Sequence, residues 1–240
     1  MVNPWMEIDG NVAKCDKERI LSLQSSIRAK QNPLHIELPP HPFYGNVRQS
    51  KLLLLSLNPG FGECDHQEQS MDADFRKELS ECLLQTKDAK LFSINNRFGG
   101  TSHGRWWRKR TLLQTDQEIH KMIFGSVDKY ADFLENNLSV IEFFGYHTKT
   151  TPDYVWARSP LPSQLYSFEL VRESIRAKKR ILIMRSKKLW ERYVTELTGY
   201  PYLYLRSPQN VSLSENNVVS PDGKKWSDIV AEMRNGIRKS

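Results

Sequence analysis

Two short segments of this chain combine residue types that can position a water molecule and contact phosphate groups. The first is the turn Asn58-Pro-Gly-Phe-Gly62, which directly follows an uncharged apolar run, Leu52 to Leu57. Pro59 pushes the residue before it into an extended conformation, so the turn offers a rigid asparagine amide. The second segment, Arg206-Ser-Pro-Gln-Asn210, combines a cation with hydroxyl and amide side chains that suit phosphate oxygens. Asparagine, proline and glycine are also common in ordinary turns, so the first segment alone does not indicate a function.

Two further groups of residues have related chemistry. Tyr146 and His147 follow a second predicted strand, Ser139 to Gly145. The segment Arg105-Trp-Trp-Arg-Lys-Arg110 interleaves cations with aromatic rings, which suits phosphate contact and base stacking. The nucleic-acid contacts expected from this segment are those of Arg105, Trp106, Arg108, Lys109 and Arg110. Adjacent tryptophans cannot share one face of a helix, so one of the pair is expected in the core and the other at the surface.

The elements that must position these residues alternate between strands and helices. Short apolar runs predict four strands, at residues 51–57, 139–145, 180–184 and 201–205. Apolar residues at helical spacing predict helices at residues 16–30, 72–87, 163–178, 187–197 and 224–237, with one or two more between 111 and 137. Residues 90–110 are expected to form a long loop. This order predicts an α/β fold, a three-layer α/β/α sandwich whose mainly parallel sheet of about four strands is covered by helices on both faces.

In a parallel sheet, the carboxyl ends of all strands lie at one edge, where open α/β sheets bind their ligands. Asn58 follows the first predicted strand, Tyr146 and His147 follow the second, and Arg206 follows the last. The topology therefore predicts that these groups converge on one cleft.

The composition indicates a globular protein with a basic balance. Among its 240 residues, 39% are hydrophobic and 26% charged, and the net charge of +7 suits a polyanionic partner. We expect one main domain at residues 46–240, with residues 1–45 packed on it as a helix and a Pro-rich lead-in. No apolar stretch approaches the roughly 20 residues that span a membrane, and we expect no signal peptide. Three widely spaced cysteines fit a reducing cytoplasm and no zinc site.

The segment Leu57-Asn-Pro-Gly60 resembles the first motif of the uracil-DNA glycosylase superfamily, in the branch whose motif carries Asn-Pro-Gly. The block from the strand at 181–184 to the segment Ser207-Pro-Gln-Asn210 is similar to its second motif, which enters DNA and pinches the backbone. The resemblance implies a uracil-DNA-glycosylase-like fold that flips a base out of DNA and cleaves its glycosidic bond without a metal or cofactor. It implies catalytic roles for Asn58, which would orient water, and His147. The implied substrate-binding residues are Pro59, Gly60, Phe61, Tyr146, Arg206, Ser207, Pro208, Gln209 and Asn210.

The chain departs from this family in two respects. Its first motif lacks the acidic base of the most active branch, and Arg206 stands where stronger relatives place a histidine. Because an asparagine is a poor general base, we expect slow turnover. Two alternatives remain: a non-catalytic nucleic-acid-binding module on the same fold, and a small-molecule or partner-binding α/β domain. A strand-end histidine such as His147 is also often structural. No nucleotide-cofactor motif is present, and the sequence does not give the oligomeric state.

Overall fold

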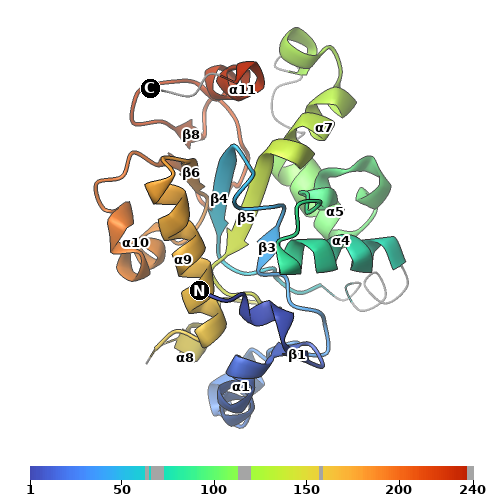
Figure 1. The fold of residues 1–240 in the computed structure, drawn as a ribbon, viewed down its shortest axis with the longest axis vertical. Coiled ribbons are helices and arrows are strands. Elements are labelled where there is room, and N and C mark those ends of the chain that lie inside the picture. Colours follow the sequence, from blue (N-terminus) through green and yellow to red (C-terminus); the bar gives the residue numbers. More distant parts are fainter. Residues whose placement is uncertain (63–64, 66–72, 113–119, 157–158, 237–240) are drawn as a thin grey trace.

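The protein is built around one six-stranded, mainly parallel sheet (Figure 1). A computed structural model describes residues 1–62, 65, 73–112, 120–156 and 159–236. The sheet order is β3-β5-β4-β6-β7-β8. The four inner strands are parallel: β4 (Leu52–Ser56), β5 (Leu138–Glu142), β6 (Arg180–Ile183) and β7 (Leu203–Leu205). The edge strands β3 (Phe43–Tyr44) and β8 (Val218–Val219) run antiparallel to β5 and β7.

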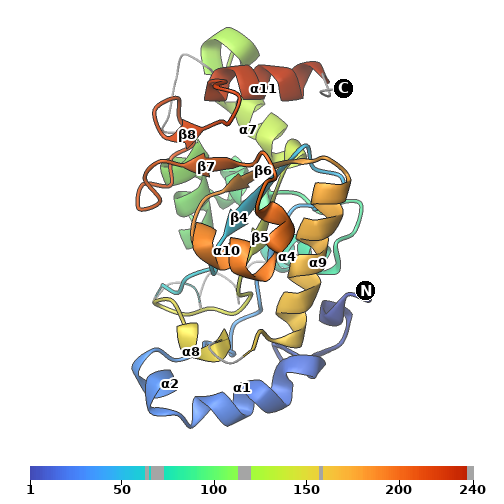
Figure 2. The ribbon, with the colours of Figure 1, turned by 90° about the vertical axis from the view of Figure 1, so that its left-hand side faces the viewer.

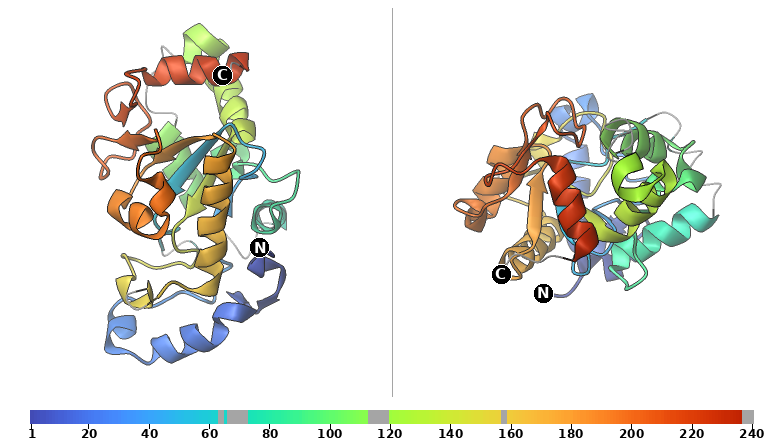
Figure 3. Two further views of the ribbon diagram at one scale, coloured as in Figure 1. Left: turned by 60° about the vertical axis from the view of Figure 1, so that its left-hand side comes forward. Right: turned by 90° about the horizontal axis from the view of Figure 1, so that it is seen from above.

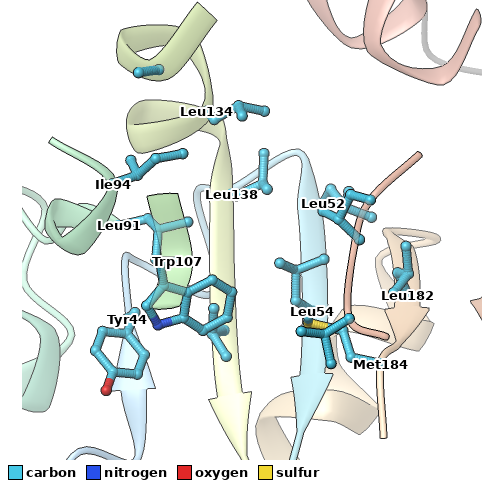
Figure 4. Close-up of a cluster of buried hydrophobic side chains, with 14 of the residues drawn as sticks. Tyr44, Leu52, Leu54, Leu91, Ile94, Trp107, Leu134, Leu138, Leu182 and Met184 are labelled. Atoms are coloured by element: carbon cyan, nitrogen blue, oxygen red, sulfur yellow. The ribbon is translucent and has the colours of Figure 1, made fainter. Parts of the chain in front are cut away.

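Strand β4 lies between β5 and β6, and its uncharged sequence follows from this position. All five of its residues are buried. Leu52 and Leu54 contribute to the core on one face of the sheet, and Leu53 and Leu55 to the core on the other. A strand covered on both faces by helices needs apolar side chains in both directions, which an uninterrupted leucine run provides. Figure 4 shows part of the first core, including Leu52, Leu54, Leu138, Leu182 and Trp107.

Helices cover both faces of the sheet, as the views in Figures 2 and 3 show. Side chains of α4 (Ala73–Leu84), α7 (Val127–Asn137) and α11 (Trp226–Asn235) belong to the first core. Side chains of α9 (Pro162–Arg176) and α10 (Lys187–Tyr193) belong to the second. Shorter helical segments are η1 (Pro4–Met6), η2 (Lys14–Asp16), η3 (Phe92–Ile94), η4 (Asn96–Phe98), α5 (Ser102–Gly104), η5 (Arg105–Leu112), η6 (His120–Phe124), α8 (Asp153–Trp156) and η7 (Thr195–Leu197). The predicted α/β class and parallel sheet are therefore confirmed.

The N-terminal segment packs along the carboxyl edge of the sheet. It contains a small hairpin, β1 (Ile8–Asp9) with β2 (Val12–Ala13), and two helices, α1 (Lys17–Gln24) and α2 (Ile27–Gln31). The backbone N–H of His35 donates to His147 O at 2.9 Å, which joins this segment to the loop after β5. Figure 1 places α1 at the end of the molecule opposite to α11. No helix among the described residues is both long and apolar enough to cross a membrane.

Three sequence-based predictions about elements are wrong. The single helix expected at 16–30 is broken, because the Ser26 side chain caps α2 by accepting from Ala29 N, and Ile27 is 76% exposed. The long loop expected at 90–110 is replaced by helical turns whose apolar side chains enter the first core, Trp107 among them. The two-residue edge strands β3 and β8 were not expected, because such short pairs leave no periodic pattern in the sequence.

Candidate functional site

Asn58 lies two residues beyond β4, at the edge where the parallel strands end. Its amide nitrogen donates to Thr148 O at 3.2 Å and to Thr148 Oγ1 at 3.0 Å. Because a carbonyl oxygen only accepts hydrogen bonds, the nitrogen must be the amide atom that faces Thr148. The Thr148 hydroxyl group then donates to Thr150 O at 2.7 Å. These contacts fix the half-buried amide and leave its oxygen, Oδ1, with no hydrogen-bond partner among the described residues.

The strand order reverses at β4. The chain passes from β4 to β5 on one side and then crosses to β6 on the other. Ligands of open α/β sheets bind outside the carboxyl ends of the strands at such a switch point. Beyond β6, Ser186 has φ +57° without being a glycine. A side chain in this left-handed region costs about 1–3 kcal/mol, and such strain is concentrated at functional sites.

The side chain of His147 holds the Asn58 turn in place by contacting the backbone carbonyl group of Gly60. Its ring nitrogens lie 2.8 Å from Gly60 O and 3.1 Å from Pro39 O, and the ring is fully buried. Burial, reinforced by His103, lowers the pKa of His147 to about 4, so the ring is neutral at pH 7. A neutral ring has one N–H group, so it donates to only one of these two carbonyl oxygens. Because each nitrogen lies against a backbone carbonyl group, neither is open to a substrate. The predicted catalytic role of His147 is therefore corrected to a positioning role.

The other predicted residues after β4 and β5 have different surroundings. Pro59, Gly60 and Phe61 are half-buried at the edge, and Gly60 adopts φ +72°, which glycine allows. The Phe61 ring stacks on His35, with centroids 3.4 Å apart and planes at 6°. Tyr146 is 1% exposed, and its hydroxyl group donates to Asp16 Oδ2 at 2.8 Å. The predicted contact between Tyr146 and a base is corrected, because this side chain belongs to the second core.

A buried histidine pair lies beside His147. His41 Nδ1 and His103 Nδ1 are each 3.0 Å from the Tyr44 hydroxyl group. Burial lowers the pKa of His41 well below its usual range and that of His103 to about 4, so both rings are neutral. One hydroxyl proton can serve only one of the two Nδ1 atoms, so Tyr44 donates to one ring and accepts from the other. The two rings must therefore hold opposite tautomers, and one Nε2 is a donor while the other is an acceptor.

Glu142 is an acidic residue at the carboxyl end of β5, paired in register with Ser56 of β4. It is 3% exposed, and its Oε2 atom has no hydrogen-bond partner among the described residues. Burial raises the pKa of Glu142 to about 7, against the opposing effects of a hydrogen bond with Ser56 and the charge of Arg185. A carboxyl group with a pKa near neutrality can act as a hydrogen-bond donor or acceptor, which is typical of functional sites.

Asp65 adds a carboxylate to the Asn58 turn. Gly62 N donates to its Oδ2 at 2.6 Å, and the side chain is 3% exposed. Its Oδ1 is buried and, like Nε2 of both His41 and His103, has no partner among the described residues. The charge of Asp65 also acts on His147 and Tyr44. Buried polar atoms are normally satisfied, so this group of unpaired atoms beside the turn indicates a place for water or a ligand.

The predicted segment 206–210 is an ordered loop beyond β7. Its backbone is fixed by Asn217, whose Oδ1 accepts from Ser207 N at 2.9 Å and whose Nδ2 donates to Ser212 O at 2.9 Å. Arg206, Pro208, Gln209 and Asn210 are exposed, and Ser207 is half-buried. The loop and the Asn58 turn lie at the same edge of the sheet, as expected from the parallel topology.

The basic aromatic segment has a mainly structural role where its side chains are described. Trp107 is 2% exposed in the first core, and Trp106 is half-buried with the Arg185 guanidinium 5.8 Å from its ring centroid. Arg108 donates to Ile94 O at 2.7 Å and pairs with Asp128, and its nucleic-acid contact stays a prediction. Arg105 is exposed and bonds to Gly100 O. The side chains of Lys109 and Arg110 lie outside the described residues.

Within the described part of the chain, no three histidine, cysteine, aspartate or glutamate side chains are placed to hold a metal ion together. The sequence reasoning missed Glu142, Asp65 and the pair His41 and Tyr44. Glu142 could have been recognised from the sequence, because it is the one charged residue in the predicted strand at 139–145. The others become recognisable only when the fold brings distant segments together.

Comparison with known proteins gives no match: no family model, no curated protein and no solved structure matches this chain. The resemblance to the uracil-DNA glycosylase superfamily therefore rests on the two motifs and their order.

Proposed function

We propose that this chain binds DNA and hydrolyses the N-glycosidic bond of a damaged or mismatched base, on a fold of the uracil-DNA glycosylase type. One observation carries the proposal: both hydrogen-bond contacts of the Asn58 amide nitrogen go to Thr148, so Oδ1 is the atom left for a water molecule. This amide stands at the switch point of a parallel sheet, where such sheets bind ligands. The order of the two motifs along the chain also supports it.

The reaction needs groups for the water and for the departing base. The bond from the sugar C1′ to the base nitrogen breaks, and the base leaves with its electron pair. The water oxygen bonds to C1′ and loses a proton, which an amide oxygen cannot accept efficiently. Oδ1 of Asp65 is an unused carboxylate oxygen beside the same turn. Glu142, when protonated, can donate a hydrogen bond to the negatively charged base as it forms.

Cations at the carboxyl edge suit the phosphates of DNA. Lys187 and Lys188 begin α10 beyond β6, and Arg206 begins the loop beyond β7; all three are exposed. Phosphate contacts of this kind fix a protein on DNA without reading its sequence. This edge is therefore the proposed DNA-binding surface.

The test is a single-turnover assay with protein in excess over labelled oligonucleotides, followed by alkaline cleavage of abasic sites. The panel contains uracil, hypoxanthine, xanthine and mismatched thymine in single and double strands. The proposal predicts slow release of at least one base. It also predicts that the logarithm of the association constant for DNA falls linearly with the logarithm of the salt concentration. Salt-dependent binding without release would leave a non-catalytic DNA-binding protein. Absence of both would refute the proposal.

A further inference from the structure

A second site lies at the opposite, amino edge of the sheet. A pocket of about 970 Å³ opens where β4, β6 and β7 begin, next to the carboxyl-terminal ends of α9 and α11. This volume is within the roughly 300–1,000 Å³ of small-molecule sites. In Figure 1 these elements surround the end of the sheet near α11, away from the N-terminal helices. The pocket is therefore separate from the Asn58 turn.

The lining of this pocket is basic. Five cationic side chains and two acidic ones line it; the cations are Arg48, Lys51, Lys178, Lys179 and Arg180, and the acids are Asp222 and Glu232. Glu232 is already paired with Arg180 at 2.6 Å. The ammonium group of Lys51 is also engaged, because its Nζ donates to Met233 O at 2.6 Å near the end of α11. Of the other three cations, Arg48 is paired with Glu173, which lies outside the lining. Lys178 and Lys179 therefore carry the remaining positive charge.

Arg48 and Lys179 repel one another, and Lys179 is partly desolvated. Lys179 is half-buried and bonds to Val47 O, with Ser50 Oγ 3.4 Å from its Nζ. Burial and, after it, the charge of Arg48 lower the pKa of Lys179 to about 8. Arg48 is held by a two-bond contact with Glu173, at 2.9 and 3.2 Å. Lys178 has no acidic partner among the described residues. An anion bound between Arg48 and the two lysines would relieve this repulsion.

The rest of the lining is less polar and consists of Tyr200, Pro201, Leu203, Pro221 and Met233, with Ala177 and small polar residues. A ligand that suits the whole lining has one anionic group and one flat or apolar part. We propose that this pocket binds a phosphorylated small molecule of the size of a nucleoside monophosphate. Its phosphate lies among Arg48, Lys178 and Lys179, and its ring lies against Tyr200 and Pro201.

The test uses the full chain and three probes: adenosine monophosphate, thymidine monophosphate and ribose 5-phosphate. Calorimetry measures affinity for the wild type, for the variant Lys178→Ser with Lys179→Met, and for a control, Lys30→Ser with Lys77→Met. The control removes the same charge from exposed positions on α2 and α4. We expect at least one probe to bind the wild type and the control alike, and to bind the pocket variant at least about tenfold more weakly.

A measurement on the wild type alone guards against a misfolded variant. Amide resonances of residues 178–180, Tyr200, Tyr202 and Leu203 should shift on addition of the probe that binds, whereas those of Asn58 and residues 60–62 should not. Asn58→Ala should bind this probe as the wild type does, which separates the pocket from the glycosylase proposal. No binding of any probe at millimolar concentration would overturn the inference. So would a pocket variant that loses affinity for duplex DNA instead of for a small phosphate.

Discussion

Glu142 is the residue whose protonation most directly affects the proposed chemistry. It is buried at the end of β5, beside the strand that carries Asn58, with one carboxyl oxygen unpaired among the described residues. Its pKa of about 7 means that near neutral pH the carboxyl group is divided between a donor and an acceptor state. The neutral form can stabilise a departing base, and the ionised form repels it.

The rate of base release should therefore depend on pH through Glu142. In the wild type, the single-turnover rate should fall as pH rises through about 7, because the neutral acid is lost. Glu142→Gln keeps a neutral donor at every pH, so its rate should not change across this range. The measurement is the single-turnover rate of both proteins between pH 5.5 and 8.5, roughly one to two units on either side of the pKa of Glu142. The same fall in wild type and variant would mean that another group titrates.

At the scale of elements, the turn from β6 into α10 carries backbone strain that a sequence change can remove. Ser186 has φ +57°, and its side chain makes no hydrogen bond at the start of α10. We predict that Ser186→Gly raises the free energy of unfolding by about 1 kcal/mol, since glycine adopts this conformation without a steric cost. Urea unfolding measures the change, and Ser186→Ala serves as the control that keeps the strain. A less stable glycine variant would show that the serine side chain has a stabilising contact.

Much of the architecture could be predicted from particular segments. The leucine run at 52–55 indicates a strand buried on both faces, as β4 is. Phe75, Leu79, Cys82 and Leu83 form the buried stripe of α4, as their spacing indicates. The predicted cap at Ser186 is only partly right, because the residue precedes α10 but its side chain makes no capping bond. Local periodicity therefore located the elements better than it located their ends.

The candidate site could be predicted only where it follows a strand. Asn58 and the loop at 206–210 were recognisable because parallel topology sends both to one edge. The His41, Tyr44 and His103 contacts join positions up to 59 residues apart, so nothing in the local sequence indicates them. For the same reason, the sequence predicts a ligand contact for Tyr146, whereas its hydroxyl group donates to Asp16 in the fold.

At the scale of the whole molecule, the buried histidines make stability depend on pH. Burial lowers the pKa of His41 well below 6.5 and that of His103 and His147 to about 4. The unfolded chain binds more protons than the folded chain between these values and about 6.5, so stability is present above pH 6.5 and is lost as pH falls toward 4. A single histidine shifted in this way contributes on the order of 3 kcal/mol.

We therefore predict a lower free energy of unfolding at pH 5 than at pH 7, measured by urea unfolding at both values. Glu142 acts in the opposite direction, because its raised pKa adds stability that is complete below about pH 4.5 and is lost as pH rises through 7. Glu142→Gln should therefore make the acid-induced loss steeper than in the wild type. Equal stability of the wild type at pH 5 and pH 7 would contradict the assignment of neutral, buried histidines.

The central claim concerns one atom, Oδ1 of Asn58, and one comparison tests it most directly. Single-turnover base release is measured for the wild type and for Asn58→Ala on the most reactive oligonucleotide, with DNA affinity measured in parallel. Asn136→Ala, at an exposed position of α7, is the control. The account predicts that Asn58→Ala lowers the rate by about a hundredfold or more and leaves affinity within about threefold, whereas the control keeps most of the rate. Unchanged release by Asn58→Ala would contradict it.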